Sequence, residues 1–412
     1  MRKPAVIVLA AAVLAALAAL PGALASSSVR SSDPGITSTT ILLGGTAPLT
    51  GPAAAYASVA RGAKAYFDYV NSKGGVAHRK IQYKYLDDGY NPALTVQDVR
   101  QLVEQDKVFS IFNTLGTEVN LSVRDYLNAN KVPQLFAASG ATTFGRDTAQ
   151  YPWTIGFQPS YQAEGFLLGQ FLAKTKKKGK VAVLFQNDDY GKDLLGGLKR
   201  GLQRSKVKVV AAQPYDVTAA DVSSQVAKLR ASGANVFAIF ATPKFAIQAY
   251  VFAGRLGWRP SVINNAVSAA SNIMVLASEG GKNKTVNGTV ALNFLKDPSD
   301  VRWKKDPGMK LYRSIMARFA KGANVADVYH VYGMAVAYET VSLFKRMGAN
   351  PTRAGLIAKA RSMNDPSNPF LLPGVAVKTG PGDGFPIQQG QLQRWTNGHW
   401  VPFGGIWTSK KL

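Results

Sequence analysis

Three loops rich in Gly, Ser and Thr carry the clearest chemistry in this sequence. TAPLTG follows the apolar run at 41–45, TLGTEVN follows 109–113, and AASGATTF follows 134–136; helix-compatible sequence comes after each loop. Small side chains let a ligand approach the backbone, and a helix start offers unpaired N–H groups with partial positive charge. Every α/β protein needs Gly and Ser where a strand turns into a helix, so one such loop would mean little. Three in succession favour a site for a small polar or anionic ligand.

Residues suited to catalysis are few and scattered. His78 follows a turn, His330 falls within a helical pattern and His399 lies next to a hairpin, a spacing that indicates neither a triad nor a metal cage. Paired acids at 87–88 and 188–189 could act in acid/base chemistry or bind a cation, but adjacent side chains diverge, and helix N-capping is the simpler role. The sequence contains no Walker loop, GxGxxG, HExxH or nucleophile elbow. We therefore expect no enzyme activity, no metal and no cofactor.

Alternating strand and helix patterns must position these loops. Strands are predicted at 41–45, 81–86, 109–113, 134–136, 180–185, 207–211, 235–240 and 261–264. Helices are predicted at 53–71, 93–105, 119–130, 162–174, 193–205 and 219–231, and a further helix after the loop ATPKF ends at 256. This alternation predicts α/β units with parallel sheets, and it restarts after Tyr161. PWTIGFQPSY separates the two units, and its prolines suit a fixed crossing segment better than a flexible linker.

The last third of the chain is less regular. Apolar residues at three- and four-residue spacing predict helices at 309–320 and 325–347. Near the end, Asn397-Gly398 separates alternating runs at 391–395 and 399–402. Asn-Gly in this position is typical of a tight β-hairpin, so we expect one there.

Residues 1–25 are predicted to be an export signal. Arg2 and Lys3 precede an apolar run from 5 to 20, and an Ala-Leu-Ala cleavage pattern ends before Ser26. A permanent membrane anchor would need about 20 apolar residues and usually more bulk than this Ala-rich run offers. The chain contains no cysteine, which excludes disulfides, thiol chemistry and a cysteine lipid anchor. We expect a soluble, exported protein of the periplasm or the extracellular cell-envelope space.

The net charge of +25 allows three interpretations: nucleic-acid binding, attraction to an anionic cell surface, or solubility alone. The basic residues are dispersed except for KTKKKGK at 174–180, where cations are also favourable because a helix ends there. The export signal favours attraction to an acidic envelope over nucleic acid. We expect no nucleic-acid partner.

Several segments together resemble one known family. They are APLTG followed by Tyr56, DDGYNP, TLGTEVN, VPQLFAASGAT, YPWTIGFQPSYQAEG, VLFQNDDYGKD and IFATPKFA. In order and spacing, from about residue 41 to 407, they resemble the exported solute-binding subunits of ABC importers, of the branched-chain amino acid type. The resemblance implies a monomer that traps a small carboxylate ligand and serves a membrane permease.

The resemblance also implies a fold, that of type I periplasmic binding proteins. Two Rossmann-like lobes with parallel central sheets flanked by helices would be joined by three crossing segments. Lobe 1 would comprise 38–158 plus 293–373, and lobe 2 would comprise 159–289 plus 376–412. A ligand would be held in the cleft between the lobes as they close.

Site residues carried over from the resemblance fall on both lobes. In lobe 1 they are Tyr56, Gly116, Thr117, Ser139, Ala141 and Thr142, and in lobe 2 they are Tyr161, Tyr190, Lys244 and Asn265. The lobe 1 loops would hold a carboxylate, each hydrogen bond to that charge contributing roughly 1.5 to 3 kcal/mol. Tyr190 and Phe245 could equally belong to the core of lobe 2.

One departure from the family pattern bears on the ligand. Amino acid binders of this type place a carboxylate in the loop after the strand near residue 261, where it pairs with the ligand's ammonium. This chain reads NNAVSAAS there, with no acid before Glu279. Burying an unpaired ammonium is costly. Either Glu118, Glu164 or Asp188 replaces the missing acid, or the ligand is an aromatic or aliphatic carboxylic acid without an amino group.

Three classes of function are consistent with the fold. A binding subunit of an importer explains the leader, the paired lobes and the lack of catalytic groups. A sensory ligand-binding module would share the fold, but is more naturally fused to a membrane span or a signalling domain. A secreted hydrolase would need a nucleophile and a base that the sequence does not offer.

Overall fold

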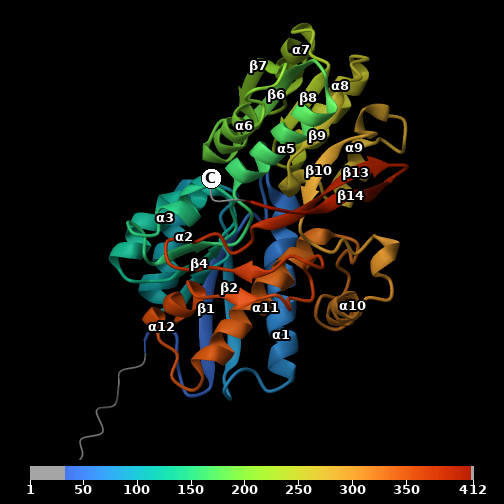
Figure 1. Ribbon diagram of the computed structural model, residues 1–412. Helices are drawn as coiled ribbons and strands as arrows, with labels where there is room; N and C mark the ends of the chain where they lie inside the picture. Colours follow the sequence, from blue (N-terminus) through green and yellow to red (C-terminus); the bar gives the residue numbers. More distant parts are fainter. Residues whose placement is uncertain (1–32, 410–412) are drawn as a thin grey trace, which may run out of the picture. The chain divides into compact units, whose positions relative to one another are not determined.

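The computed structural model describes residues 33–409, so the predicted export signal lies outside the described residues. The N-terminal strands form a five-stranded sheet in the order β2-β1-β3-β4-β5 (Figure 1). They are β1 (Thr40–Ala47), β2 (Lys80–Asp87), β3 (Ser110–Phe112), β4 (Gln134–Ala137) and β5 (Thr154–Gly156). All neighbouring pairs are parallel, as predicted. The segment expected only to cross between units contributes β5, the edge strand of this sheet.

The second sheet has seven strands in the order β14-β13-β10-β9-β8-β6-β7. Its parallel part comprises β6 (Gly179–Gln186), β7 (Val207–Tyr215), β8 (Val236–Phe240), β9 (Ser261–Asn264) and β10 (Val290–Asn293). The hairpin of β13 (Gln389–Thr396) and β14 (His399–Thr408) is added antiparallel to β10. Asn397 and Gly398 have φ angles of 51° and 80°, the left-handed conformation that this two-residue turn requires, so the predicted hairpin is confirmed.

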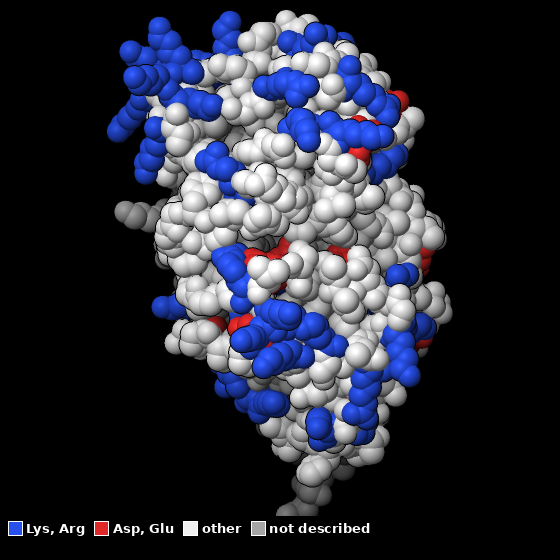
Figure 2. Space-filling model, turned by 90° about the vertical axis from the view of Figure 1, so that its right-hand side faces the viewer, with Lys and Arg blue, Asp and Glu red and all other residues white. Residues whose placement is uncertain are grey.

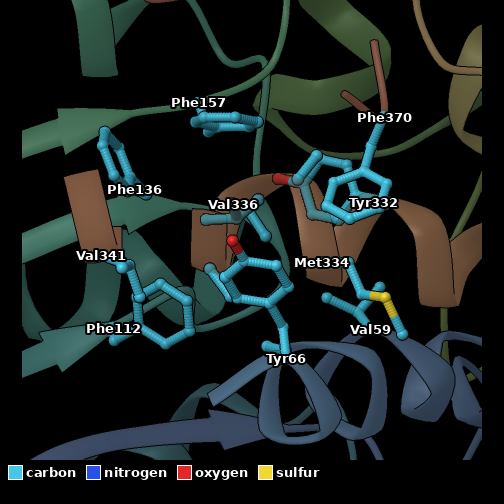
Figure 3. Close-up of a cluster of buried hydrophobic side chains, with 14 of the residues drawn as sticks. Val59, Tyr66, Phe112, Phe136, Phe157, Tyr332, Met334, Val336, Val341 and Phe370 are labelled. Carbon is cyan, nitrogen blue, oxygen red and sulfur yellow. The ribbon is translucent and has the colours of Figure 1, made fainter. Parts of the chain in front are cut away.

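Helices of the first sheet come from both ends of the chain. They are η1 (Ala54–Tyr56), α1 (Ala57–Ser72), α2 (Pro92–Arg100) with the π-helical turn η2 (Gln101–Gln105), α3 (Thr117–Ala129), α4 (Thr143–Arg146), α10 (Pro307–Phe319), α11 (Val328–Met347) and α12 (Arg353–Ala360). A Cβ on Gly333 would lie 2.0 Å from the carbonyl oxygen of Val59, so α1 and α11 pack backbone to backbone. The main core lies around this contact, where rings from α1, β3 and β4 meet α11 (Figure 3).

Helices of the second sheet are α5 (Tyr161–Thr175), α6 (Asp189–Gly201), α7 (Ser223–Ala231), α8 (Pro243–Arg255) and α9 (Ser271–Ala277). Helix α6 begins four residues before the predicted start, because the side chain of Asp188 caps it by accepting from the N–H of Gly191. In the other acidic pair, Asp87 accepts from the N–H groups of Leu49 and Thr50. The structure thus gives acids of both pairs roles in a helix cap and a turn, as the simpler interpretation predicted for the capping acid.

The connections explain why both sheets are discontinuous in sequence. The chain leaves the first sheet after β5, returns after β10, and enters the second sheet again at β13, so three segments cross between the sheets. The remaining short elements are η3 (Ala266–Ser268) and η4 (Lys284–Val286), both between β9 and β10, and η5 (Val301–Trp303), β11 (Asn364–Asp365) and β12 (Val377–Lys378), which lie between β10 and β13. The predicted fold class, two parallel α/β sheets flanked by helices and joined by three crossings, is confirmed. Among residues 33–409, no helix is both long and apolar enough to cross a bilayer.

Candidate ligand-binding site

A pocket lies where the carboxyl ends of strands from both sheets face each other. It encloses about 840 Å³ of space free of protein atoms, part of it open to solvent. The first sheet contributes the loops after β3 and β4, and the second contributes the start of α6 and the loops after β8 and β9; residues beside the crossings complete the wall. This is the edge at which open α/β sheets bind small molecules.

Six tyrosines dominate the wall: Tyr56, Tyr90, Tyr161, Tyr190, Tyr329 and Tyr332. Tyr56 packs edge-on against Tyr329 with ring centroids 5.0 Å apart, and Tyr161 packs edge-on against Tyr190 at 4.9 Å. Burial raises the pKa of all six phenols, so they are neutral at physiological pH. They offer a ligand flat apolar faces and hydroxyl groups without net charge.

Two of these tyrosines connect the two sides of the pocket. The hydroxyls of Tyr56, from η1, and Tyr329, from α11, both donate to the carbonyl oxygen of Val267, at 3.0 and 2.8 Å. Val267 lies in η3, which follows β9 of the second sheet. The loop after β9 is therefore held against elements of the first sheet.

The N-terminus of α3 is the best-placed anion site. Gly116 and Thr117 both line the pocket, and no side chain caps this helix, so N–H groups of its first turn are left for another acceptor. The Thr117 and Ser139 hydroxyl oxygens are 2.8 Å apart, and the Ser139 hydroxyl accepts from the N–H of Ala141 at 3.0 Å. Ser139 and Ala141 are thus buried behind Thr117 and do not line the pocket.

Thr142 is drawn into a different interaction. Its N–H donates to the Asp193 carboxylate of α6 at 2.7 Å, and its hydroxyl oxygen is 3.2 Å from that of Ser160. Asp193 also accepts from the side-chain amide of Gln162 at 2.8 Å. The loop expected to hold the ligand's carboxylate at Thr142 holds a carboxylate of the chain itself.

Asn265 stands in the loop where the family pattern would place an acid. The side-chain oxygen of this fully buried residue accepts from the hydroxyls of Tyr190, at 3.1 Å, and Ser268, at 3.2 Å. Its side-chain nitrogen is buried without a hydrogen-bond partner. Asn265 does not itself line the pocket, although its partner Tyr190 does.

Lys244 lies away from the main pocket. It lines a second hollow, outside Tyr90, where loops 51–52 and 89–92 approach 217–218. Its ammonium donates to the carbonyl oxygen of Ala219 at 3.3 Å and lies 4.8 Å from the centre of the Phe245 ring. Phe245 is fully buried in the core of the second sheet, which is the core role considered for it above. Tyr190 is both a core residue and part of the pocket wall.

Acidic groups near the pocket accept hydrogen bonds from other groups of the chain. Among the described lining residues Asp297 alone is charged, and its carboxylate accepts from the Ser271 hydroxyl and from the N–H and hydroxyl of Ser299. Burial raises the pKa of Asp297, which favours its neutral form. Glu118, Glu164 and Asp188, the three candidates to replace the missing acid, do not line the pocket.

Glu164 has a structural partner instead. This fully buried carboxyl accepts from the N–H of Ala266 at 2.6 Å and so fixes the start of the loop after β9. Burial raises the pKa of Glu164 to about 8, and burial likewise raises the pKa of Asp188 to about 6. Glu164 is therefore mostly protonated at neutral pH and is a poor partner for a cation.

Sequence reasoning placed five residues that line the pocket: Tyr56, Gly116, Thr117, Tyr161 and Tyr190. It missed the polar lining residues Tyr90, Gln158, Thr242, Tyr329, Tyr332, Asn293, Asp297 and Gln393. Tyr90 and Gln158 lie inside segments that carry the family resemblance, which was an available signal. Tyr329 and Tyr332 have the spacing of a buried helix face and look like core residues. Asn293 is the last residue of β10 and Asp297 follows it, and this strand has no clear sequence pattern.

Comparison with known proteins settles the family. The family model described as periplasmic binding protein matches residues 40–399. The chain belongs to this family. A curated relative of this binding protein, the Leu/Ile/Val-binding protein homolog 3 of Brucella melitensis, is 30% identical over 198 residues, which are 48% of this chain and 53% of the relative. The chain thus spans about half the length of the curated relatives it matches.

Solved structures share the fold over nearly the whole binding protein. A branched chain amino acid ABC transporter protein of Thermus thermophilus with bound valine has a TM-score of 0.78 at 17% identity, covering 91% of this chain and 98% of that one. A fatty acid ABC transporter substrate-binding protein of Thermomonospora curvata has a TM-score of 0.76 at 21% identity, covering 92% and 95%. The family and these neighbours are binding proteins rather than enzymes, and their ligands include both an amino acid and fatty acids.

Proposed function

We propose that this binding protein is the exported, monomeric substrate-binding subunit of an ABC importer, and that its ligand is a small apolar carboxylic acid without an amino group. The observation that carries the ligand assignment is Asn265, a buried amide with an unpartnered nitrogen at the position where amino acid binders place an acid. A neutral amide supplies no negative charge there to pair with a ligand's ammonium, whose burial without a partner is costly. Asp297, the acid among the described lining residues and so the remaining candidate partner for an ammonium, already accepts three hydrogen bonds.

The pocket offers complementary groups for such an acid. The carboxylate would accept from the N–H groups at the start of α3 and from the Thr117 hydroxyl, because Gly116 and Thr117 both line the pocket. The apolar part would contact tyrosine rings and the side chains of Val59, Leu115 and Val328. Burial of a leucine-sized group contributes roughly 1.5 to 3 kcal/mol, a gain that an unpaired ammonium would cancel.

Capture would rest on closure of the two lobes, whose boundaries remain as predicted above. Three contacts between elements of different sheets would favour the closed form: those of Tyr56 and Tyr329 with Val267, and that of Thr142 with Asp193. Only a closed cleft contacts the ligand from both sides, so binding would shift the population of lobes toward closure. A membrane permease would then receive the loaded protein.

A branched-chain amino acid is the second candidate. The Brucella relative carries that assignment in its name, and Asp297 is an acid in the pocket wall. If Asp297 were ionised and turned toward the ligand, it would supply the missing partner of the ammonium. Leucine and its desamino analogue have the same carbon skeleton, so comparison of the two isolates the amino group.

Isothermal titration calorimetry with leucine, 4-methylpentanoate and 3-phenylpropanoate tests the assignment. We expect at least one of the acids to bind about tenfold or more tightly than leucine. In Asn265→Asp, the new carboxylate should weaken binding of the acids and improve that of leucine, while the same change at the exposed Asn287 should leave both affinities unchanged. Tighter binding of leucine than of both acids by the wild-type protein would restore the amino acid assignment.

A further inference from the structure

The amino-terminal ends of β6 and β7 carry a concentration of positive charge without acids. Residues 165–187 and 194–215 contain no Asp or Glu. The exposed basic residues in these stretches that lie at the start of the two strands form what we call the distal basic cluster: Lys177, Lys178, Lys180, Arg204, Lys206 and Lys208. Figure 2 shows basic side chains gathered at the end of the molecule that carries β6 and β7 in Figure 1.

Strand pairing forces these like charges together. β6 and β7 are parallel neighbours, with Gly179 beside Val207 and Lys180 beside Lys208. Lys177 and Lys178 precede β6, and Arg204 precedes β7, so both segments enter the sheet at the same end of its strands. Like charges on neighbouring strands destabilise a sheet, and the cluster therefore lowers the stability of the fold.

The chain does not neutralise this charge. Of the ion pairs found within residues 33–409, none includes a residue of the distal basic cluster. The adjacent Lys176 donates to the Ser261 hydroxyl at 2.8 Å, which is a neutral partner. The positive potential of the cluster is consequently directed at the solvent.

Structural roles explain only some of the basic residues in this region. Lys174, which precedes the cluster, lies in the last turn of α5, where the helix dipole favours a cation. β7 is an edge strand, and Lys206 and Lys208 help to prevent its pairing with another chain. Neither role applies to Lys177 and Lys178, which lie outside both helix and strand.

The cluster is remote from the ligand pocket. Strand β6 runs for eight residues from Gly179 to Gln186, and the pocket residue Tyr190 follows its other end. At about 3.3 Å per residue, the two ends of the strand are roughly 25 Å apart. A partner on the cluster would leave the pocket free.

We propose that the distal basic cluster docks this protein onto the surface of an anionic lipid bilayer. Lysine ammonium groups interact with lipid phosphates as point charges and need no shaped groove. Single-stranded nucleic acid is the poorer fit, because the segments 174–180 and 204–208 contain no aromatic residue on which a base could stack. The cluster is distant from the pocket, so the proposal is independent of the ligand assignment.

Vesicle co-sedimentation tests this proposal. The probes are vesicles of phosphatidylglycerol mixed with phosphatidylcholine and vesicles of phosphatidylcholine alone. The cluster variant is K177Q/K178Q/K206Q/K208Q, and the matched control is K304Q/K305Q/K310Q/K321Q, which removes the same charge from exposed positions near α10. The wild type and both variants have the same N-terminus, so membrane binding by residues 1–25 is the same in all three. Binding to the neutral vesicles measures that contribution.

We expect the wild type to bind the anionic vesicles and to lose binding as salt is raised. The cluster variant should bind about tenfold or more weakly, and the control should change by less than roughly twofold. Equal losses in both variants would show that net charge alone acts and would overturn the proposal. So would wild-type binding that does not distinguish anionic from neutral vesicles. Thermal melts of each variant, which should match or exceed the wild type for the cluster variant, establish that the fold is intact.

Discussion

The two walls of the pocket are built in different ways. The first-sheet wall consists of the start of α3 and of tyrosines anchored in the main core, where Tyr332 packs against Phe157 at a ring distance of 5.9 Å. The second-sheet wall includes the loop after β9, which donates one hydrogen bond to Glu164 and accepts one each from Tyr56 and Tyr329. A rigid wall suits the constant part of a ligand, its carboxylate, whereas a loop held at a few points can change with the ligand's other end. We therefore expect affinity to reside mainly in the first wall and selectivity in the second.

The largest effect is expected from Gly116→Ala. Gly116 has a φ of 120°, and a Cβ there would lie 2.6 Å from the ring of Tyr90. The added methyl group strains the backbone and displaces the ring at the mouth of the anion site, so calorimetry with 4-methylpentanoate should show at least about a hundredfold loss of affinity, or about 2.7 kcal/mol. Gly196→Ala is the control, because a Cβ at that helical position meets open space. Unchanged affinity in Gly116→Ala would place the anion elsewhere.

A smaller loss is expected from Thr117→Val. The substitution keeps the shape of this pocket-lining side chain but removes its hydroxyl, which contacts that of Ser139. Loss of one hydrogen bond to a carboxylate should weaken binding of 4-methylpentanoate about tenfold, or 1.4 kcal/mol. Thr117→Ser retains the hydroxyl and should bind nearly as well as the wild type. If both variants lose affinity equally, the methyl group rather than the hydroxyl matters.

The loop contacts should have moderate effects on affinity. Tyr56→Phe and Tyr329→Phe each remove one hydrogen bond to Val267, at a cost of about 0.5 to 1.5 kcal/mol, and should increase the dissociation rate more than they reduce the association rate. Stopped-flow fluorescence measures both rates. Tyr338→Phe, which removes an exposed hydroxyl contact with Ser367, is the control. Should the association rate fall instead, these tyrosines assist encounter and do not hold a closed form.

The smallest effect concerns pH and the anchor of the second wall. The pKa of Glu164 is about 8 in the fold against an ordinary value of 4.5. Between these values the unfolded chain releases a proton that the folded chain keeps, so the Glu164 contribution to stability is full below about pH 4.5 and is lost as pH rises to about 8. Glu164→Gln keeps the acceptor for Ala266 and should flatten the fall of the melting temperature over this range.

Two comparisons make that pH measurement specific. The exposed Glu279→Gln should leave the pH profile of the melting temperature unchanged. Glu339 is also buried and has its pKa raised to about 8, so Glu339→Gln should flatten the profile in the same direction without touching the pocket. A profile of Glu164→Gln that is identical to that of the wild type would contradict the raised pKa of this carboxyl.

The difference between the walls also marks how far the sequence could predict the site. The first wall was readable, because Gly116 and Thr117 follow an apolar strand and precede a helix, which is local information. Tyr56 and Tyr190 entered through the family resemblance. Tyr329 could not be distinguished from a core residue, since its role depends on the loop after β9, which is distant in sequence.

The fold was predicted where elements are long and periodic. β10 has four residues and α9 has seven, and neither length carries enough periodicity to reveal its type. Thr142 shows another limit. Its neighbours have the composition of an anion site, yet its N–H donates to the Asp193 carboxylate. A contact between residues so far apart cannot be predicted from local sequence.

The arrangement of the second sheet determines when the chain can finish folding. Its interior strand β10 has one neighbour, β13, that comes from nearly the end of the sequence, and β14 follows only after the hairpin turn. Until these last residues are available, β10 has an unpaired edge and the sheet is incomplete. Contacts between such distant segments form slowly because the loop that they close is long. A chain of this topology therefore cannot complete its second sheet until the segment that carries β13 and β14 is available to pair with β10.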